Sequence, residues 1–315
     1  MCTNITLKST QDHFLMARTM DFSFELDPEM ILIPRHVPLH FAFLDNEVTN
    51  HFAYFGLAKN IGSYALADGV NEYGLAAAAL YFEGFAHYEH DAIVNQSLAP
   101  HEVVMWALAH CKTVEDVRLM FARHPITHHV IEFLGIVPPL HWVFQDATGA
   151  SIIVEPTPQG IQIYTNQIGV LTNSPDYPWH LTNIRNYIGL DPGHVEARTL
   201  YGQEFKPFGQ GSGTFGIPGD LTPPSRFIKA LYSKLSAQKP ESDHELIITA
   251  QHILNGVDIA KGNVITQRKT IDYTQYMSFM IPSSQTYAYR TYDSFNTYSY
   301  CLHDYNLNQS EFIKI

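Results

Sequence analysis

The chain has 315 residues, a length that allows one or two domains with a large buried core. Hydrophobic residues make up 45% of it and charged residues only 16%, which indicates a globular protein without a long disordered tail. The 19 Lys and Arg residues against 31 Asp and Glu give a net charge of −12, and no basic cluster offsets it. The composition therefore argues against a nucleic-acid partner.

The cysteines and the first residues bear on the compartment. Cys2, Cys111 and Cys301 are spread over the chain without a CxxC pair, a pattern that fits neither a disulfide framework nor a zinc site. No basic segment precedes an apolar run at the start, and no apolar stretch is long enough to cross a membrane. We therefore expect a cytoplasmic protein without membrane contact, whose open frame begins with the mature chain.

The first predicted element is a β-hairpin. Residues 3–7 and 14–18 form the two strands, on either side of a polar turn. This geometry would bring Arg18 and Asp21 back towards Cys2.

Further strands follow in the first third of the chain. Apolar runs at 30–33 and 51–57 predict short strands, and 64–82 predicts two more. Within the last range, Asp68-Gly69 and Tyr73-Gly74 are typical turn pairs.

Two helices are predicted next. The first begins near Pro100, and its apolar face includes Cys111, which we interpret as a core thiol. Thr113 is the predicted N-cap of the second helix.

The second half of the chain mixes strands and helices. Residues 140–165 predict a three-strand meander, and two helices are expected from Arg226 and from Asp243, the latter as a cap. Strands rich in Tyr, Thr and Phe follow from 264. Runs of strands and runs of helices favour an α+β layered domain over βαβ units.

Two segments give weaker structural signals. Residues 180–207 have little periodicity, and 208–220 form a glycine-rich loop. That loop lacks both GKS/T and a GxGxxG entering a helix, so we do not expect nucleotide binding.

Cys2 offers the most economical chemistry. If Met1 is removed, this residue carries a thiol and a free α-amine, with ordinary pKa values of about 8.5 and about 7.7–8.0. The amine can then accept the proton of the thiol, so one residue supplies both nucleophile and base.

Such a nucleophile needs help to cleave an amide. A cation favours the thiolate, a carboxylate holds the charges in place, and fixed donors stabilise the tetrahedral oxyanion. Arg18, Asp21, Asn173 and Arg226 are candidates by residue type. Each also has an ordinary structural explanation, as a surface ion pair, a strand-end turn or the first turn of a helix.

Other catalytic arrangements have less support. The densest histidines, around His128, are interrupted by Pro125, and no HExxH or GxSxG motif is present. A cysteine–histidine pair using Cys111 or Cys301 stays open, because the chain has 17 histidines.

Several motifs together resemble one family. They are Met1-Cys2-Thr3, Ala17-Arg18-Thr19-Met20-Asp21-Phe22, Asp68-Gly69-Val70-Asn71-Glu72-Tyr73-Gly74-Leu75, Leu140-His141-Trp142, Leu171-Thr172-Asn173-Ser174-Pro175, Gly216-Ile217-Pro218-Gly219-Asp220, Pro223-Pro224-Ser225-Arg226-Phe227 and Tyr273-Thr274-Gln275-Tyr276. In this order they resemble the choloylglycine hydrolase family, which contains penicillin V acylases and conjugated bile salt hydrolases.

The resemblance implies a single domain over 1–315 with the αββα four-layer sandwich of N-terminal-nucleophile hydrolases, active without a cofactor or metal after Met1 is removed. Cys2 would be the nucleophile and its amine the base. Arg18 and Asp21 would lie beside them, Asn173 would contribute to the oxyanion hole, and Arg226 would organise the charges.

Substrate preference rests on fewer residues. Tyr81 stands where the family's penicillin V acylases typically have Tyr and its bile salt hydrolases Asn, which favours a penicillin V acylase; Met20, Ala67 and Leu134 are the other expected pocket residues. Conjugated bile salts are the main alternative, followed by N-acyl homoserine lactones and by a non-catalytic binding protein. The family implies a homotetramer, with 183–207 as the pairing excursion.

Overall fold

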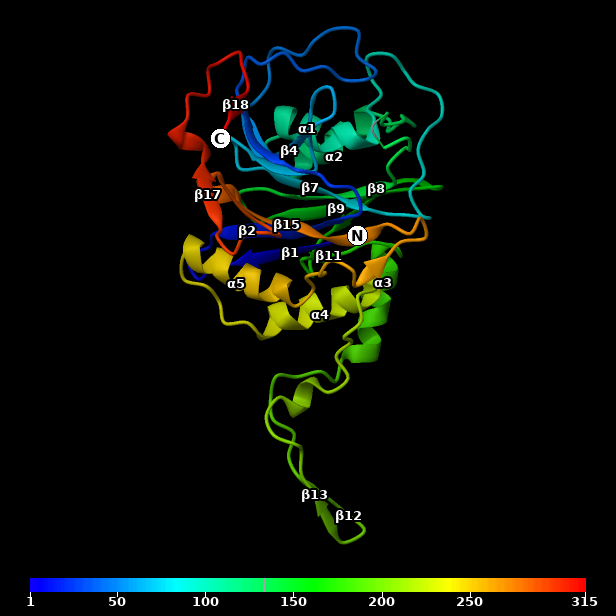
Figure 1. Ribbon diagram of the computed structural model, residues 1–315, viewed down its shortest axis with the longest axis vertical. Helices are drawn as coiled ribbons and strands as arrows, with labels where there is room; N and C mark the ends of the chain where they lie inside the picture. The colour runs from blue at the N-terminus through cyan, green and yellow to red at the C-terminus, as the bar shows by residue number, and fades with distance from the viewer. Residues whose placement is uncertain (133) are drawn as a thin grey trace.

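The computed structural model describes residues 1–132 and 134–315, which build four layers (Figure 1). Two antiparallel sheets lie face to face in the middle. Helices α1 and α2 cover the outer face of one sheet, and α4 and α5 cover the outer face of the other. The α+β class and the αββα order of layers predicted from the sequence are confirmed.

The first sheet is organised around the N-terminal hairpin. Its strand order is β11-β1-β2-β15-β16-β17, with β14 paired to β15. The bounds are β1 Cys2–Lys8, β2 Phe14–Phe22, β11 Val170–Leu171, β14 Val264–Ile265, β15 Ile271–Ile281, β16 Thr286–Thr291 and β17 Tyr298–Cys301. Cys2 is paired with Met20 in the hairpin, so the predicted return of β2 towards Cys2 is confirmed.

The second sheet has the order β10-β9-β8-β7-β6-β4-β3-β18, with β5 paired to β4. Its strands are β3 Glu29–Ile33, β4 Tyr54–Asn60, β5 Tyr64–Leu66, β6 Asp68–Asn71, β7 Ala76–Tyr81, β8 Leu140–Gln145, β9 Ser151–Thr157, β10 Gly160–Thr165 and β18 Ile313–Lys314. The predicted meander is β8 to β10. Asp68 begins strand β6 and is fully buried, so its assignment to a turn was wrong, whereas Gly74 adopts the left-handed conformation of a turn.

Four of the helices, α1, α2, α4 and α5, begin close to the predicted positions, whereas α3 was not predicted. Their bounds are α1 Val103–His110, α2 Val114–Arg123, α3 Tyr177–Asn183, α4 Pro223–Ser236 and α5 Asp243–Asn255, and short 3-10 turns lie at Pro100–Glu102, Ile184–Tyr187, Ser212–Thr214, Pro282–Ser284 and Leu302–Asp304. Thr113 caps α2 as expected. Two details differ: Ser242 rather than Asp243 caps α5, and Cys111 lies one residue beyond α1, although it is buried.

A long arm leaves the body between α3 and α4 (Figure 1). Its tip is the hairpin of β12 Arg198–Leu200 and β13 Gln203–Phe205. The glycine-rich segment forms its returning side, where Gly213 bonds the 191–193 turn. A Cβ at position 213 would lie 2.3 Å from the Gly193 carbonyl oxygen, so the close approach of these two segments of the arm requires glycine.

No helix in the described part of the chain is long and apolar enough to cross a membrane. Among residues 1–132 and 134–315, no group of three or more His, Cys, Asp or Glu side chains is placed to hold a metal ion.

Candidate active site

The alternation of side chains along β1 and β2 divides the site into two faces. Cys2 lies opposite Met20 in the hairpin, and Arg18 is its diagonal neighbour, so these three side chains share the face that looks toward the second sheet. Thr3 and Asp21 point to the other face, towards helix α4. The thiol and the carboxylate are therefore held on opposite sides of one hairpin.

Arg18 links the thiol to a buried anionic cluster. Its Nη2 donates to Cys2 Sγ at 2.7 Å and its Nη1 to Asp68 Oδ2 at 3.0 Å. The hydroxyls of Tyr276 and Tyr287 donate to the same carboxylate. Burial opposes the charge of Arg18, but Cys2, Tyr276 and Asp68 outweigh it and raise the pKa of the guanidinium. Arg18 thus stays cationic and stabilises negative charge on Sγ.

Asp21 and Arg226 occupy the opposite face. Asp21 accepts a hydrogen bond from Thr274 Oγ1 at 2.6 Å, and the Arg226 Nη1 lies 3.7 Å from its carboxylate. Arg226 also donates to the carbonyl of Cys2 at 2.7 Å and to Thr3 Oγ1 at 2.6 Å. Burial raises the pKa of Asp21, an effect that Arg226 opposes. Arg226, with Asp21 beside it, therefore holds the backbone of Cys2 from the face that carries helix α4.

Asn173 connects the two faces. Its Oδ1 accepts from the backbone nitrogen of Cys2 at 2.8 Å and from Arg226 Nη2 at 2.7 Å. Because both partners are donors, the orientation of the amide is fixed. Its Nδ2 donates to the Tyr81 carbonyl at 2.8 Å and has a second hydrogen to offer.

The backbone N–H of Tyr81 points to the side of β7 on which Asn173 Nδ2 lies. Ala79, two residues earlier on β7, sends its N–H to the Ala67 carbonyl, away from β8. Backbone N–H and C=O groups of residues two positions apart point to the same edge of a strand. The N–H and the carbonyl of Tyr81 therefore both point away from β8, as the N–H of Ala79 does, and Asn173 binds that carbonyl. The Tyr81 N–H and Asn173 Nδ2 form a pair of donors beside Cys2, of the kind that stabilises an oxyanion.

Met1 lies just before strand β1 and bonds the backbone of Asp21 on β2. Its carbonyl accepts from the Asp21 N–H at 3.0 Å, while its ammonium donates to the Asp21 carbonyl at 2.6 Å and to Asp272 Oδ2 at 3.1 Å. The backbone nitrogen of Cys2 is therefore an amide here. Removal of Met1 would convert that atom, already bonded to Asn173, into a free amine.

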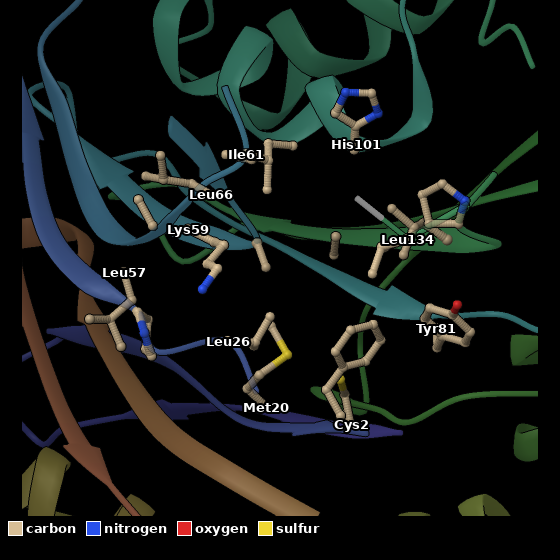
Figure 2. A pocket seen from close by; sticks show the side chains of 18 of the residues that line it. Cys2, Met20, Leu26, Leu57, Lys59, Ile61, Leu66, Tyr81, His101 and Leu134 are labelled. Atoms are coloured by element: carbon tan, nitrogen blue, oxygen red, sulfur yellow. The ribbon is translucent and has the colours of Figure 1, made fainter. Parts of the chain in front are cut away.

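A cavity of about 950 Å³, including the space that opens to solvent, lies on the thiol side of the hairpin (Figure 2). Cys2 stands at one side, and most of the wall consists of aliphatic side chains from β4, β5, β7 and the segment before β8. Tyr81, Met20, Ala67 and Leu134, the residues expected in the pocket, all line it. The ring of Tyr81 meets Phe22 edge to face, with centroids 5.8 Å apart.

The structure brings Cys2, Arg18, Asp21, Asn173 and Arg226 together, although Asn173 and Arg226 lie more than 150 residues from Cys2 along the chain. The other cysteines lie elsewhere: Cys111 is buried after α1, and Cys301 is at the end of β17.

Sequence reasoning missed the residues that hold these groups. Asp68, Tyr276 and Thr274 lie in quoted motifs, but their contacts with Arg18 and Asp21 were not foreseen. His180 and Asp272 were not singled out either. His180 is fully buried, its Nε2 donates to the Asn173 carbonyl at 2.9 Å, and its ring stacks on Phe227. The segment around His180 has no periodic apolar pattern, so the sequence offered no signal for it.

Comparison with known proteins gives the family. The model of the linear amide C–N hydrolases, choloylglycine hydrolase family, matches residues 2–315. The chain belongs to this family. It is an amide hydrolase by that membership, as the sequence motifs implied.

Curated relatives cover nearly the whole chain. A bile salt hydrolase/transferase of Clostridium perfringens is 33% identical over 99% of this chain and 95% of the relative. A conjugated bile acid hydrolase of Lactobacillus gasseri is 32% identical over 99% of both. The names of both relatives match conjugated bile salts, the alternative substrate class of the sequence analysis. Penicillin V, the substrate that Tyr81 favoured there, stays unconfirmed.

Solved structures agree with the fold. The C2A mutant of a conjugated bile acid hydrolase from Clostridium perfringens superposes with a TM-score of 0.92 and 31% identity, over 100% of this chain and 96% of that one. A penicillin V acylase from Agrobacterium tumefaciens gives 0.79 at 19% identity over 99% and 90% of the two chains, a likeness of fold alone.

Proposed function

We propose that this protein hydrolyses the amide bond of conjugated bile salts, with Cys2 as the nucleophile after removal of Met1. The observation that carries the proposal is the open, mostly aliphatic cavity beside Cys2 Sγ, whose apolar wall suits a steroid acyl group. The bile salt hydrolase names of relatives about a third identical to the chain support the same substrate class.

The first step forms a covalent intermediate. The Cys2 amine accepts the thiol proton, and the thiolate, stabilised by Arg18, attacks the amide carbonyl carbon. The carbonyl oxygen becomes an oxyanion that Asn173 Nδ2 and the Tyr81 N–H stabilise. The tetrahedral intermediate then collapses: the C–N bond breaks, and the Cys2 ammonium protonates the leaving amine.

The second step restores the enzyme. A water molecule attacks the thioester carbonyl while the Cys2 amine takes one of its protons. The C–S bond breaks, the carboxylic acid departs, and the thiolate returns. Arg226 and Asp21 keep the amine in place throughout, through the Cys2 carbonyl and the Asn173 amide oxygen.

Two measurements test this function. Intact mass should show that Met1 is absent from the purified protein, and the protein should release glycine from glycocholate. Cys2→Ala should reduce that activity to background without loss of the folded state. Activity in Cys2→Ala, or in protein that retains Met1, would contradict the mechanism.

Penicillin V is a second candidate substrate, favoured by one observation. Tyr81 and Phe22 form an aromatic pair in the cavity, which suits the phenoxy ring of that substrate. We expect Tyr81→Leu to lower kcat/KM for penicillin V about tenfold, the weight of one aromatic contact, and to affect glycocholate less. The two substrates should be assayed side by side.

A further inference from the structure

One acidic side chain already receives an N-terminal ammonium in the unprocessed chain. The Met1 ammonium donates to Asp272 Oδ2 at 3.1 Å. Asp272 is 6% exposed, and its Oδ1 has no hydrogen-bond partner in the described part of the chain. Nor does any Lys, Arg or His side chain of residues 1–132 and 134–315 form a salt bridge with it. Removal of Met1 therefore leaves a buried carboxylate without its cation, which is costly unless another cation replaces it.

Strand β15 places Asp272 on the face of the sheet that carries Asp21, opposite the thiol. Thr274 lies two residues further along this strand, on the same face, and donates to Asp21. The Met1 and Cys2 nitrogens are separated by three covalent bonds, a span of at most about 3.7 Å. The ammonium that Cys2 gains on processing therefore forms close to the place that the Met1 ammonium leaves.

The other charges around Cys2 are paired with one another. Two guanidinium–carboxylate pairs lie beside it: Arg18 with Asp68 and Arg226 with Asp21. The neighbouring tyrosines stay neutral, because burial raises their pKa; they are Tyr276 and Tyr81, whose hydroxyl has Arg268 beside it. His180, behind Asn173, is neutral because burial lowers its pKa to about 4. Asp272 is thus the third carboxylate of the site, and in the unprocessed chain the N-terminal ammonium is its counterion.

We propose that Asp272 is a positioning residue of the mature enzyme, whose carboxylate pairs with the Cys2 α-ammonium and keeps it charged until the leaving amine takes its proton. This role rests on the proposed function, in which the thiol proton moves to the Cys2 amine. Cys2 then carries a thiolate, which Arg18 stabilises, and an ammonium, which Arg18 and Arg226 would disfavour by themselves. Asp272 supplies the opposite charge that balances them.

The alkaline limb of the pH profile tests this role in protein without Met1. That limb of kcat/KM for glycocholate reports deprotonation of the Cys2 ammonium, because the neutral amine cannot protonate the leaving group. Asp272→Asn should move the limb about one pH unit lower, the effect of losing a nearby opposite charge, so that kcat/KM above the limb falls about tenfold. A merely structural role would lower kcat/KM at every pH and leave the limb in place, and that result would overturn the proposal.

Two variants of equal size isolate the charge. Asp272→Glu keeps a carboxylate at this position and should keep the alkaline limb close to its wild-type pH, whereas Asp272→Gln should lower it. This pair also replaces the comparison if Asp272→Asn does not fold. Asp91→Asn removes a carboxylate from an exposed loop, so it controls for the change in net charge and should leave the limb in place. A limb at the same pH in the Glu and Gln variants would contradict the role of the carboxylate.

Failure of the proposed function would be visible separately. NMR of protein labelled with [13C]cysteine follows the Cα resonance of Cys2 with pH and needs no substrate. The alkaline inflection of this resonance should lie about one pH unit lower in Asp272→Asn than in the wild type. If the wild type does not hydrolyse glycocholate but the inflection moves, only the proposed function fails. If glycocholate is hydrolysed and the inflection stays, Asp272 does not pair with the Cys2 ammonium.

Discussion

At the scale of single residues, the site depends on charges that are buried and paired. Arg18, Asp68 and Asp21 have no exposed surface, and each has two or more partners in the site. A buried charge is tolerated only when partners replace water, so the loss of one partner is costly. The same pairing fixes the position of Cys2 Sγ against Arg18.

Arg18 should not tolerate a lysine. One ammonium cannot keep the planar, two-sided contact with Asp68 and Cys2 Sγ that the guanidinium makes. We expect Arg18→Lys to lower kcat/KM for glycocholate by about a hundredfold, on the order of one charged hydrogen bond. Arg198→Lys, on the exposed arm, is the matched control. Near wild-type turnover in Arg18→Lys would show that the site does not need simultaneous contacts with Asp68 and Cys2 Sγ.

The thiols should differ in reactivity. Burial raises the pKa of Cys111 to about 12, so this thiol is protonated at neutral pH. In protein without Met1, iodoacetamide at pH 7.5 should modify Cys2 and leave Cys111 intact, as followed by peptide mass spectrometry. Modification of Cys111 at the rate of Cys2 would contradict the burial seen here.

At the scale of elements, the arm between α3 and α4 contributes little to the core. Its β12-β13 hairpin is exposed throughout, and it carries large apolar side chains in solvent. Tyr201, Phe208 and Phe215 are more than 90% exposed. Exposed aromatic residues gathered on one projection are typical of a surface that contacts a partner. The predicted excursion also extends past 207, because the glycine-rich segment returns along it.

We propose that this arm pairs subunits in a homotetramer, as the family resemblance implies. Replacing Tyr201, Phe208 and Phe215 by serine should shift the protein to a smaller species in size-exclusion chromatography with light scattering. The matched control is serine at Phe295, which is 97% exposed in the β16–β17 connection. If the wild type is already a monomer, the arm has another role.

At the scale of the whole molecule, stability should fall in mild acid. Burial lowers the pKa of His180 to about 4, against 6.5 in an unfolded chain. Between these pH values the unfolded state binds a proton at His180 that the folded state does not. The free energy of unfolding therefore rises with pH across this window, and the contribution of His180 is lost as the pH falls from about 6.5 to 4.

His180→Gln should weaken that dependence. From the shift, His180 contributes a loss of about 2 kcal/mol between pH 7 and pH 5, which the variant should not show. Urea unfolding at both pH values measures it. His244→Gln, at an exposed position of α5, should keep the wild-type dependence. A wild type equally stable at both values would mean that His180 is charged in the folded state.

The elements of this fold are largely encoded locally. The alternation of 3–7 and 14–18, the cap at Thr113 and the meander over 140–165 were each predicted correctly, because period-two patterns, caps and turn residues act over a few positions. Asp68 was misassigned for the same reason: Asp-Gly favours a turn locally, whereas the buried donors Arg18, Tyr276 and Tyr287 explain an aspartate on a strand.

The sequence by itself determined the layered α+β class, the hairpin that returns Arg18 to Cys2, and, through its motifs, the family. The tertiary structure decided what these residues contact. Asn173 and Arg226 meet Cys2 only because β11 pairs with β1 and α4 packs beneath the sheet. The wall of the cavity, with Lys59 in it, is likewise built from strands distant in sequence, and no local pattern encodes which side chains face one another across two sheets.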